Sequence, residues 1–243
     1  MPDFIDQSFI YIAVAVLVAG LIRGFTGFGS AMVMAPVLVH TLGPAEAVAT
    51  NMLLEFAVSL QLVPAARKHI DFKMLAPLGV GAWLCVPLGV WIVVAVDEEI
   101  MRRTVSILIL SFVIILALGW RYQGTVRIWL STIIGGVSGL LSGATSMGGP
   151  PIILYLISGP NDPVRVRSTI ILYFVLSIIP TLGSLVWAGV ISADVLFRAA
   201  VLTPPFLLTA WTGSKFFHIA SEMFFRRLTL SLLAIIALTS LII

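Results

Sequence analysis

Long apolar runs, separated by short polar or glycine-rich stretches, cover most of the 243 residues. A helix that crosses a bilayer needs about 20 predominantly apolar residues. Several runs meet this length without interruption, and we predict that each of them is a full transmembrane helix. These runs are residues 45–65, 74–96, 101–120, 167–187, 195–217 and 224–243.

Two further apolar regions, residues 9–42 and 128–158, are each too long for one span. The first is interrupted by RGFTGFGS, which begins at Arg23, and the second by SGATSMGGPP, which begins at Ser142. Glycine permits sharp turns, and irregular backbone survives at membrane depth only where it is buried in protein or lines a wet cavity. We therefore predict that each region is a broken, re-entrant pair of short helices.

The chain also repeats its own pattern. Residues near the end of the first half recur 124 residues later, and residues near its start recur 115 to 116 residues later. The first set pairs Gly89, Glu98 and Arg102-Arg103 with Gly213, Glu222 and Arg226-Arg227, and the second pairs Gly24, Pro36 and Gly43-Pro44 with Gly139, Pro151 and Gly159-Pro160. We predict two homologous repeats, residues 1–120 and 128–243, joined by a linker at 121–127. Each repeat would hold one broken pair and three full helices.

Composition supports an all-α polytopic membrane protein. The chain is 60% hydrophobic and only 10% charged, and its mean hydropathy is +1.13. The single Cys85 argues against a disulfide framework, and His40, His69 and His218 lack metal-ligand spacing, so we expect neither a metal nor a cofactor. No basic tract suggests nucleic acid as a partner. The acidic start, MPDFIDQ, lacks the basic region of a signal peptide, so the first apolar stretch is expected to remain.

The distribution of lysine and arginine predicts an orientation. If each broken pair crosses the membrane an even number of times and the N-terminus is outside, ten of the thirteen lysines and arginines other than Arg23 lie inside, Arg165 and Arg167 among them, and Arg102, Arg103 and Arg198 lie outside. If each pair instead crosses once, six of these thirteen residues lie on one side of the membrane and seven on the other. The positive-inside rule therefore favours an even number of crossings. The two repeats are then inverted, and both termini of this multi-pass protein lie outside the cell (inner or plasma) membrane.

Inverted repeats with interrupted segments at matching positions are typical of secondary transporters with a site near the midplane. The restarted helix after each break would point its first N–H groups at a cavity, which favours a small anion. The candidate ligands combine these backbone groups with hydroxyls, an amide and one guanidinium. They are Arg23, Gly24, Thr26, Gly27, Gly29 and Ser30 in the first motif, Ser142, Thr145, Ser146, Gly148 and Gly149 in the second, and Asn51, Ser168 and Thr169 on the following spans.

Each of these residues has a structural alternative. Small residues at three- or four-residue spacing often serve close helix packing in membranes. Arg23 either faces the anion or extends to the inner interface. Glu55, about ten residues into its span, either couples transport to protons or forms a structural partnership with Arg23. Asn51, one helical turn earlier, either contacts the substrate or bonds a neighbouring helix.

The motifs GFTGFGSAMVMAPVL and GLLSGATSMGGPPIILYL resemble the paired glycine-rich motifs of the TauE/SafE (TSUP) family of sulfite and organosulfonate exporters. The resemblance extends over essentially the whole chain, and the second motif is the more specific of the two. It implies transport of sulfur-containing anions such as sulfite, taurine-like sulfonates or sulfoacetate, driven by an ion gradient, with H⁺ as our candidate coupling ion. The first motif has Ser30-Ala31 where many members are richer in glycine, and the second has hydroxyls where others are apolar.

Other functions remain open at this point. A carrier or channel for another small anion, such as a carboxylate, would use the same breaks. An intramembrane serine hydrolase would use Ser146 with His40 as its base, which is a remote alternative because His40 sits near the end of its apolar segment. The direction of transport and the oligomeric state are not encoded in any of these patterns.

Overall fold

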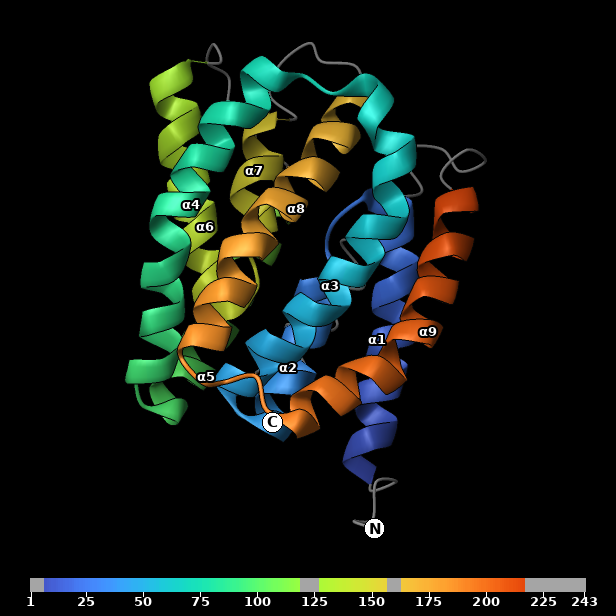
Figure 1. Cartoon of the computed structure of the whole chain (residues 1–243), viewed down its shortest axis with the longest axis vertical. Coiled ribbons are helices and arrows are strands. Elements are labelled where there is room, and N and C mark those ends of the chain that lie inside the picture. The colour runs from blue at the N-terminus through green and yellow to red at the C-terminus, as the bar shows by residue number, and fades with distance from the viewer. Residues whose placement is uncertain (1–6, 119–126, 157–162, 217–243) are drawn as a thin grey trace.

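The computed structural model describes residues 7–118, 127–156 and 163–216, and every regular element in them is a helix (Figure 1). The helices are α1 (Gln7–Thr26), α2 (Ser30–Leu42), α3 (Pro44–Ala66), the short 3-10 helix η1 (Arg67–His69), α4 (Phe72–Ala95), α5 (Glu98–Ala117), α6 (Ile128–Thr145), α7 (Gly149–Leu156), α8 (Pro163–Trp187) and α9 (Ala193–Phe216). The predicted all-α membrane class is confirmed. The predicted span at 224–243 and most of the linker lie outside the described residues.

Among the described residues, six helices are long and apolar enough to cross a membrane: α1, α3, α4, α6, α8 and α9. Four of them correspond to predicted spans. The first helix of each broken pair is longer than expected, with 20 residues in α1 and 18 in α6, and only α2 and α7 are short. Helix α5 is not among the six, and its first turns carry Glu98, Glu99, Arg102 and Arg103.

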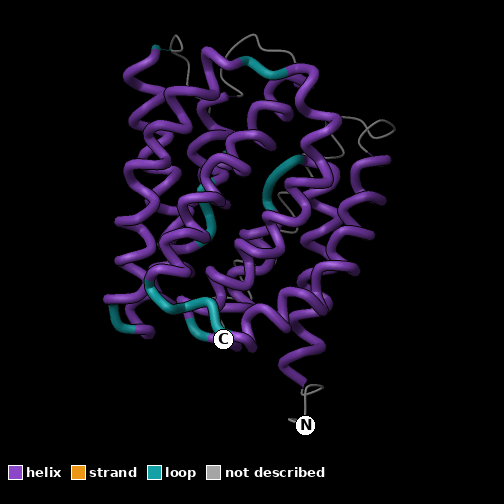
Figure 2. The backbone as a smooth tube through the Cα atoms, viewed as in Figure 1, coloured by secondary structure: helices purple, strands orange, loops and turns teal. Residues whose placement is uncertain are grey.

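The two predicted interruptions are short loops inside the helical bundle (Figure 2). The first break comprises residues 27–29 and the second break residues 146–148. Left-handed backbone turns the chain in both, at Gly27 and Gly29 in the first and at Ser146 in the second, where φ is 80°, 87° and 61°. A threonine hydroxyl stabilises each turn by accepting a backbone N–H two residues on: Thr26 from Phe28 at 2.8 Å, and Thr145 from Met147 at 3.3 Å.

Glycine allows two pairs of parallel helices to approach closely. Helix α1 packs along α9, and α6 packs along α4, with glycines spaced four residues apart on the facing surfaces of α1 and α6. A Cβ at Gly24 would overlap the carbonyl oxygen of Ala210, and one at Gly135 would overlap that of Leu78. This is the small-residue packing that membrane helices use in place of a hydrophobic driving force.

The contacts of these two helix pairs correspond residue by residue. Gly20–Phe206 in the first helix pair corresponds to Gly139–Ala82 in the second. In the same way, Gly24–Ala210 corresponds to Gly143–Val86, and Leu21–Gly213 corresponds to Leu140–Gly89. Helices α4 and α9 therefore align at the predicted spacing of 124 residues, whereas α1 and α6 align at a spacing of 119 residues. The contacts therefore match Gly24 with Gly143 rather than with the predicted Gly139, and Pro36, inside α2, is not equivalent to Pro151, in the first turn of α7. In Figure 1, α3 runs upward and the corresponding helix α8 runs downward, whereas α4 runs downward and the corresponding helix α9 runs upward. The complete division into two inverted repeats stays a prediction.

The buried apolar residues form two clusters rather than one. The first lobe is built around α1, α2 and α9, and the second lobe around α4, α6 and α7. Helices α3 and α8 contribute residues to both clusters. The first lobe also includes Met147 from the second break, and the second lobe includes Phe28 from the first break. The two breaks consequently meet where the lobes join.

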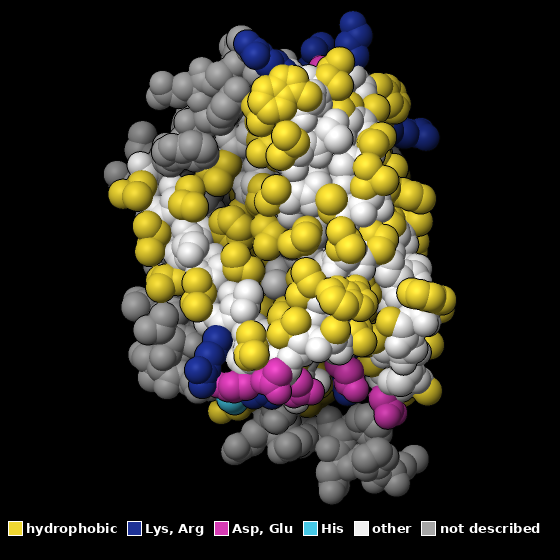
Figure 3. All heavy atoms as spheres, turned by 90° about the vertical axis from the view of Figure 1, so that its left-hand side faces the viewer, with side chains coloured by type: hydrophobic (Ala, Val, Ile, Leu, Met, Phe, Trp, Pro, Cys, Tyr) yellow, Lys and Arg dark blue, Asp and Glu magenta, His cyan; other side chains and the backbone are white. Residues whose placement is uncertain are grey.

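The two ends of the bundle differ in charge, and an apolar surface separates them (Figure 3). Acidic residues gather at the end where α5 begins, and each arginine described there is paired with a glutamate. These pairs are Arg102–Glu98, Arg103–Glu99 and Arg198–Glu46, with N···O distances of 3.9, 2.9 and 3.1 Å. The opposite end holds Arg67, Lys68, Lys73, Arg127, Arg165 and Lys215.

Candidate functional site

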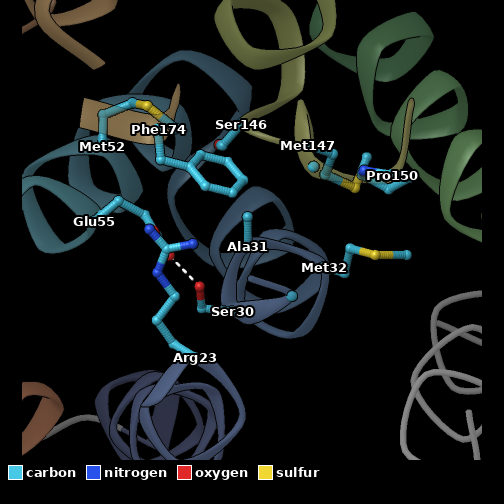
Figure 4. A pocket seen from close by; sticks show the side chains of 12 residues that line it. Arg23, Ser30, Ala31, Met32, Met52, Glu55, Ser146, Met147, Pro150 and Phe174 are labelled. Atoms are coloured by element: carbon cyan, nitrogen blue, oxygen red, sulfur yellow. Dashed lines mark hydrogen bonds and ion pairs between the residues drawn. The ribbon is translucent and has the colours of Figure 1, made fainter. Parts of the chain in front are cut away.

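Both breaks line one cavity in the interior of the bundle (Figure 4). Its polar lining comes from Arg23 and Glu55, which belong to α1 and α3, and from Ser30 and Ser146 at the two breaks. Gly29, Gly149 and Pro150 bring the backbone of both breaks to the same space. The cavity thus lies where the sequence predicted a shared site, between the interrupted segments.

Arg23 is the charged centre of this cavity. Its side chain is completely buried, with 0% exposure, and its Nη2 lies 3.1 Å from the Oε2 of Glu55, which is 2% exposed. This contact is an ion pair without hydrogen-bond alignment, but Arg23 also donates to the Gly27 carbonyl at 2.5 Å and to the Ser59 hydroxyl at 2.9 Å. The alternative in which Arg23 extends to the interface is therefore wrong, because burial and these partners hold it inside the bundle.

Glu55 has a second partner in the first break. The Ser30 hydroxyl donates a hydrogen bond to its Oε1, so the carboxylate connects the guanidinium to the start of α2 (Figure 4). A buried carboxylate is expensive in a membrane unless it is paired and hydrogen-bonded. The partnership of Glu55 with Arg23, one of the two alternatives drawn from the sequence, is thus present in this conformation.

The rest of the cavity is apolar and was not anticipated from sequence. The Phe174 ring lies against the guanidinium of Arg23, with the Cζ atom 4.4 Å from the ring centroid, which is cation–π geometry. Met32, Met52 and Met147 supply flexible thioether side chains to the wall, and Ala31 completes it. Apolar side chains carry no signal in a membrane sequence, because the whole chain is apolar.

The two helix starts at the cavity are unequal. Helix α2 begins after Gly29, and no side chain caps it, so the N–H groups of its first turn are not used by a capping residue. Helix α7 begins GPP, and its two prolines have no N–H to offer. The sequence predicted two comparable helix ends, but the donors are concentrated at the first break, which also holds the charge.

The cavity is small in this conformation. Its volume is about 10 Å³, close to what a single water molecule needs. A small oxyanion does not fit without movement of the lining. Three methionines and a phenylalanine are side chains that can move aside without breaking hydrogen bonds.

Several other predicted ligands have structural roles in this conformation and do not line the cavity. Gly24 packs against α9, and a Cβ at Gly148 would lie 2.6 Å from the carbonyl oxygen of Ser138. Thr26 and Thr145 use their hydroxyls inside the breaks. Gly27 faces Arg167, whose Cγ would lie 3.2 Å from a Cβ at that position. Packing, the alternative considered for the small residues, thus accounts for part of both motifs.

A further group of predicted ligands is buried but outside the cavity lining. Within the described part of the chain, no hydrogen-bond partner is present for the side-chain amide of Asn51 or for the hydroxyls of Ser142 and Thr169. Thr50, which the sequence analysis did not select, is in the same situation. Ser168 is buried near the start of α8. Unsatisfied buried polar groups are costly, so these side chains are candidates for contacts in another conformation.

Arg167 is a residue that sequence reasoning treated only as a signal of orientation. Its Nη2 donates to the carbonyl oxygen of Gly24 at 2.8 Å, which connects α8 to the end of α1 across 143 positions of sequence. Two arginines therefore donate to backbone carbonyls at or next to the first break, Arg23 from α1 and Arg167 from α8.

Comparison with known proteins identifies the family of the chain. The family model described as "Sulfite exporter TauE/SafE" matches residues 12–240, which is most of the chain. The chain belongs to the TauE/SafE family. A relative from Cupriavidus necator (strain H16), described as a probable sulfite/organosulfonate exporter TauE, is 30% identical over 204 residues, covering 79% of this chain and 77% of the relative. No solved structure matches the chain.

Membership in the TauE/SafE family makes the protein a membrane transporter rather than an enzyme. The remote hydrolase alternative is therefore wrong. The geometry offers a physical reason as well. Ser146 lines the cavity, but the histidine considered as its base, His40, is an exposed residue near the end of α2 and does not line it.

Proposed function

We propose that this TauE/SafE protein transports small sulfur-containing anions, sulfite or organosulfonates, and binds them in the cavity between the two breaks. The observation that carries the proposal is the buried Arg23 at the point where both interrupted segments meet. Guanidinium matches the geometry of planar and tetrahedral oxyanions. The description of the C. necator relative supports sulfur anions over other classes.

Substrate binding would rearrange the polar contacts of Arg23. An anion that approaches the guanidinium competes with Glu55, which already occupies it through the 3.1 Å ion pair. Protonation of Glu55 would release Arg23 and remove the repulsion between carboxylate and substrate. The N–H groups at the start of α2 and the Ser30 and Ser146 hydroxyls would then complete the site. One proton would thereby move with one anion in the same direction, so the anion gradient and the proton gradient together would set the direction of transport.

The two lobes are the natural moving units for alternating access. The contacts α1–α9 and α4–α6 join helices of different repeats through close glycine packing, so the repeats themselves cannot separate as rigid bodies. The cavity lies where the lobes meet, and α3 and α8 pass between them. We propose that the lobes tilt about these two helices and open the cavity to one end at a time.

The charge of the two ends supports an orientation. The basic end would face the cytoplasm, and the acidic end, where α1 begins, would face outward. Export from the cytoplasm then starts at the basic end, where the local potential attracts anions.

The test is transport by purified protein in liposomes loaded with ³⁵S-sulfite or ³⁵S-taurine, with and without an imposed proton gradient. We expect protein-dependent flux that saturates with concentration and changes with the gradient. Flux of radiolabelled short carboxylates without sulfite or sulfonate flux would favour the carboxylate alternative. Flux that does not saturate and ignores the proton gradient would instead favour a channel.

A further inference from the structure

We infer that Arg167 is a second anion-recognition residue, which holds the substrate at the basic end of the cavity before it reaches Arg23. This inference rests on the proposed anion transport. It adds a residue from the other repeat to a site whose charge otherwise comes from α1 and α3 alone.

The position of Arg167 is the first argument. Helix α8 begins at the basic end of the bundle, and Arg167 lies one turn after Pro163. Phe174, which lines the cavity, follows seven residues later, about 10 Å further along the helix. Arg167 is only partly buried, whereas Arg23 is completely buried. An anion that arrives from the basic end therefore reaches Arg167 first.

The contacts of Arg167 are the second argument. Its guanidinium donates to the Gly24 carbonyl at 2.8 Å, and its side chain covers Gly27 in the first break. Gly27 in turn accepts a hydrogen bond from Arg23. The two arginines thus donate to two carbonyls of one short segment, and the positive charge of Arg23 acts on Arg167. An anion oxygen can take the place of the Gly24 carbonyl as acceptor of the Arg167 hydrogen bond.

The charges of Arg23, Arg167 and Glu55 also favour an anion at this position. Glu55 is the only carboxylate among the buried residues that the structure describes, and it is bound to Arg23. The repulsion between the two guanidinium groups is relieved when a monoanion lies between them. Arg167 would therefore raise the affinity for substrate on the basic side and help to displace Glu55 from Arg23.

The experiment measures the concentration dependence of ³⁵S-sulfite flux for the wild type, Arg167→Gln, Arg167→Lys and the control Arg165→Gln. Arg165 is exposed at the same end, two residues away, so its variant reports any loss of general surface potential. We expect Arg167→Gln to raise KM about tenfold or more with Vmax within about twofold of the wild type. Arg167→Lys keeps the charge but loses the fork of donors, so its KM should lie between the two.

Thermal unfolding of each variant separates recognition from structure. A merely structural Arg167 would give Arg167→Gln a lower Tm and a lower Vmax with unchanged KM, which would overturn the inference. An equal rise in KM for Arg165→Gln would overturn it too, because general potential would then explain the effect. Wild-type protein without sulfite or taurine flux would overturn the proposed function and this inference together, whereas wild-type flux with an unaffected Arg167→Gln would overturn the inference alone.

Discussion

Arg23 carries a positive charge to a position with no solvent exposure, in a chain that spans a membrane. The energetic cost of this burial is offset by Glu55, by two oxygen acceptors and by the face of Phe174. Breaking a buried ion pair by removing one partner is more damaging than replacing both, because an uncompensated charge remains. The pair is thus a constraint on stability as well as the centre of the proposed site.

Glu55→Gln tests that constraint. The variant leaves Arg23 without its counter-charge, and we expect a loss of about 3–5 kcal/mol in unfolding free energy, seen as a lower Tm in detergent. The matched control is the double variant Arg23→Met/Glu55→Leu, which removes both charges. It should recover most of the Tm while transporting no sulfite. A wild-type Tm for Glu55→Gln would contradict the buried pair.

The sequence identified some site residues and not others, for physical reasons. Arg23, Ser30 and Glu55 stand out because polar groups inside an apolar run need an explanation. Gly24 and Gly29 belong to one motif, but Gly24 faces α9 and Gly29 faces the cavity, and only the three-dimensional packing separates them. Phe174 could not have been selected, since its role depends on the position of Arg23 more than 150 residues earlier.

At the scale of elements, glycines perform two separable functions. Those on α1, α4, α6 and α9 permit close helix packing, whereas Gly27 and Gly29 permit a turn with positive φ. The packing glycines should matter for stability, and the turn glycines for transport.

Gly27→Leu and Gly149→Leu test one glycine at each break, the turn glycine Gly27 and the cavity-lining Gly149. Leucine at Gly27 would strain a backbone with φ of 80° and displace Arg167, and leucine at Gly149 would contact Phe174, from which a Cβ is only 3.3 Å away. We expect both variants to reach the membrane folded and to lose sulfite flux. Gly183→Leu is the matched control because nothing lies within 4 Å of its Cβ position, and it should transport normally. Unchanged flux in both test variants would refute the site assignment.

Gly24→Leu and Gly143→Leu test the packing positions. Each side chain would collide with the backbone of a neighbouring helix, Ala210 in one case and Val86 in the other. We expect both variants to lose about 1–3 kcal/mol of stability or to fail to fold. The two losses should be similar because the contacts correspond. Size-exclusion profiles and thermal unfolding in detergent provide the measurement, and a wild-type Tm for either variant would contradict the close approach.

At the scale of the whole molecule, the two ends of the bundle make orientation testable. In a Cys85→Ala background, Lys68→Cys and Glu99→Cys place single exposed thiols at the basic and acidic ends. We expect a membrane-impermeant maleimide to label Glu99→Cys on intact cells and Lys68→Cys only after permeabilisation. The reverse pattern would place the basic end outside and overturn the direction of the proposed export path.

The helical class and the positions of the two breaks followed from the hydrophobic pattern, because span length and interruptions are local properties. The arrangement of the lobes did not. The repeat suggested two separate halves, but the glycine faces of α1 and α6 pack against helices of the opposite half. Which glycine faces which helix depends on contacts between distant segments, and a single sequence does not record them.

The pairing of α1 with α9 also determines how the protein can be made. Helix α6 follows α4 after one intervening helix, so the second lobe can begin to assemble midway through synthesis. Helix α1 leaves the ribosome first, yet the helix that covers its glycine face is among the last to be translated. Until then, α1 must remain in lipid or be held by the insertion machinery, with the polar first break exposed. The step that completes the packing of the first lobe is therefore also a late step in biogenesis.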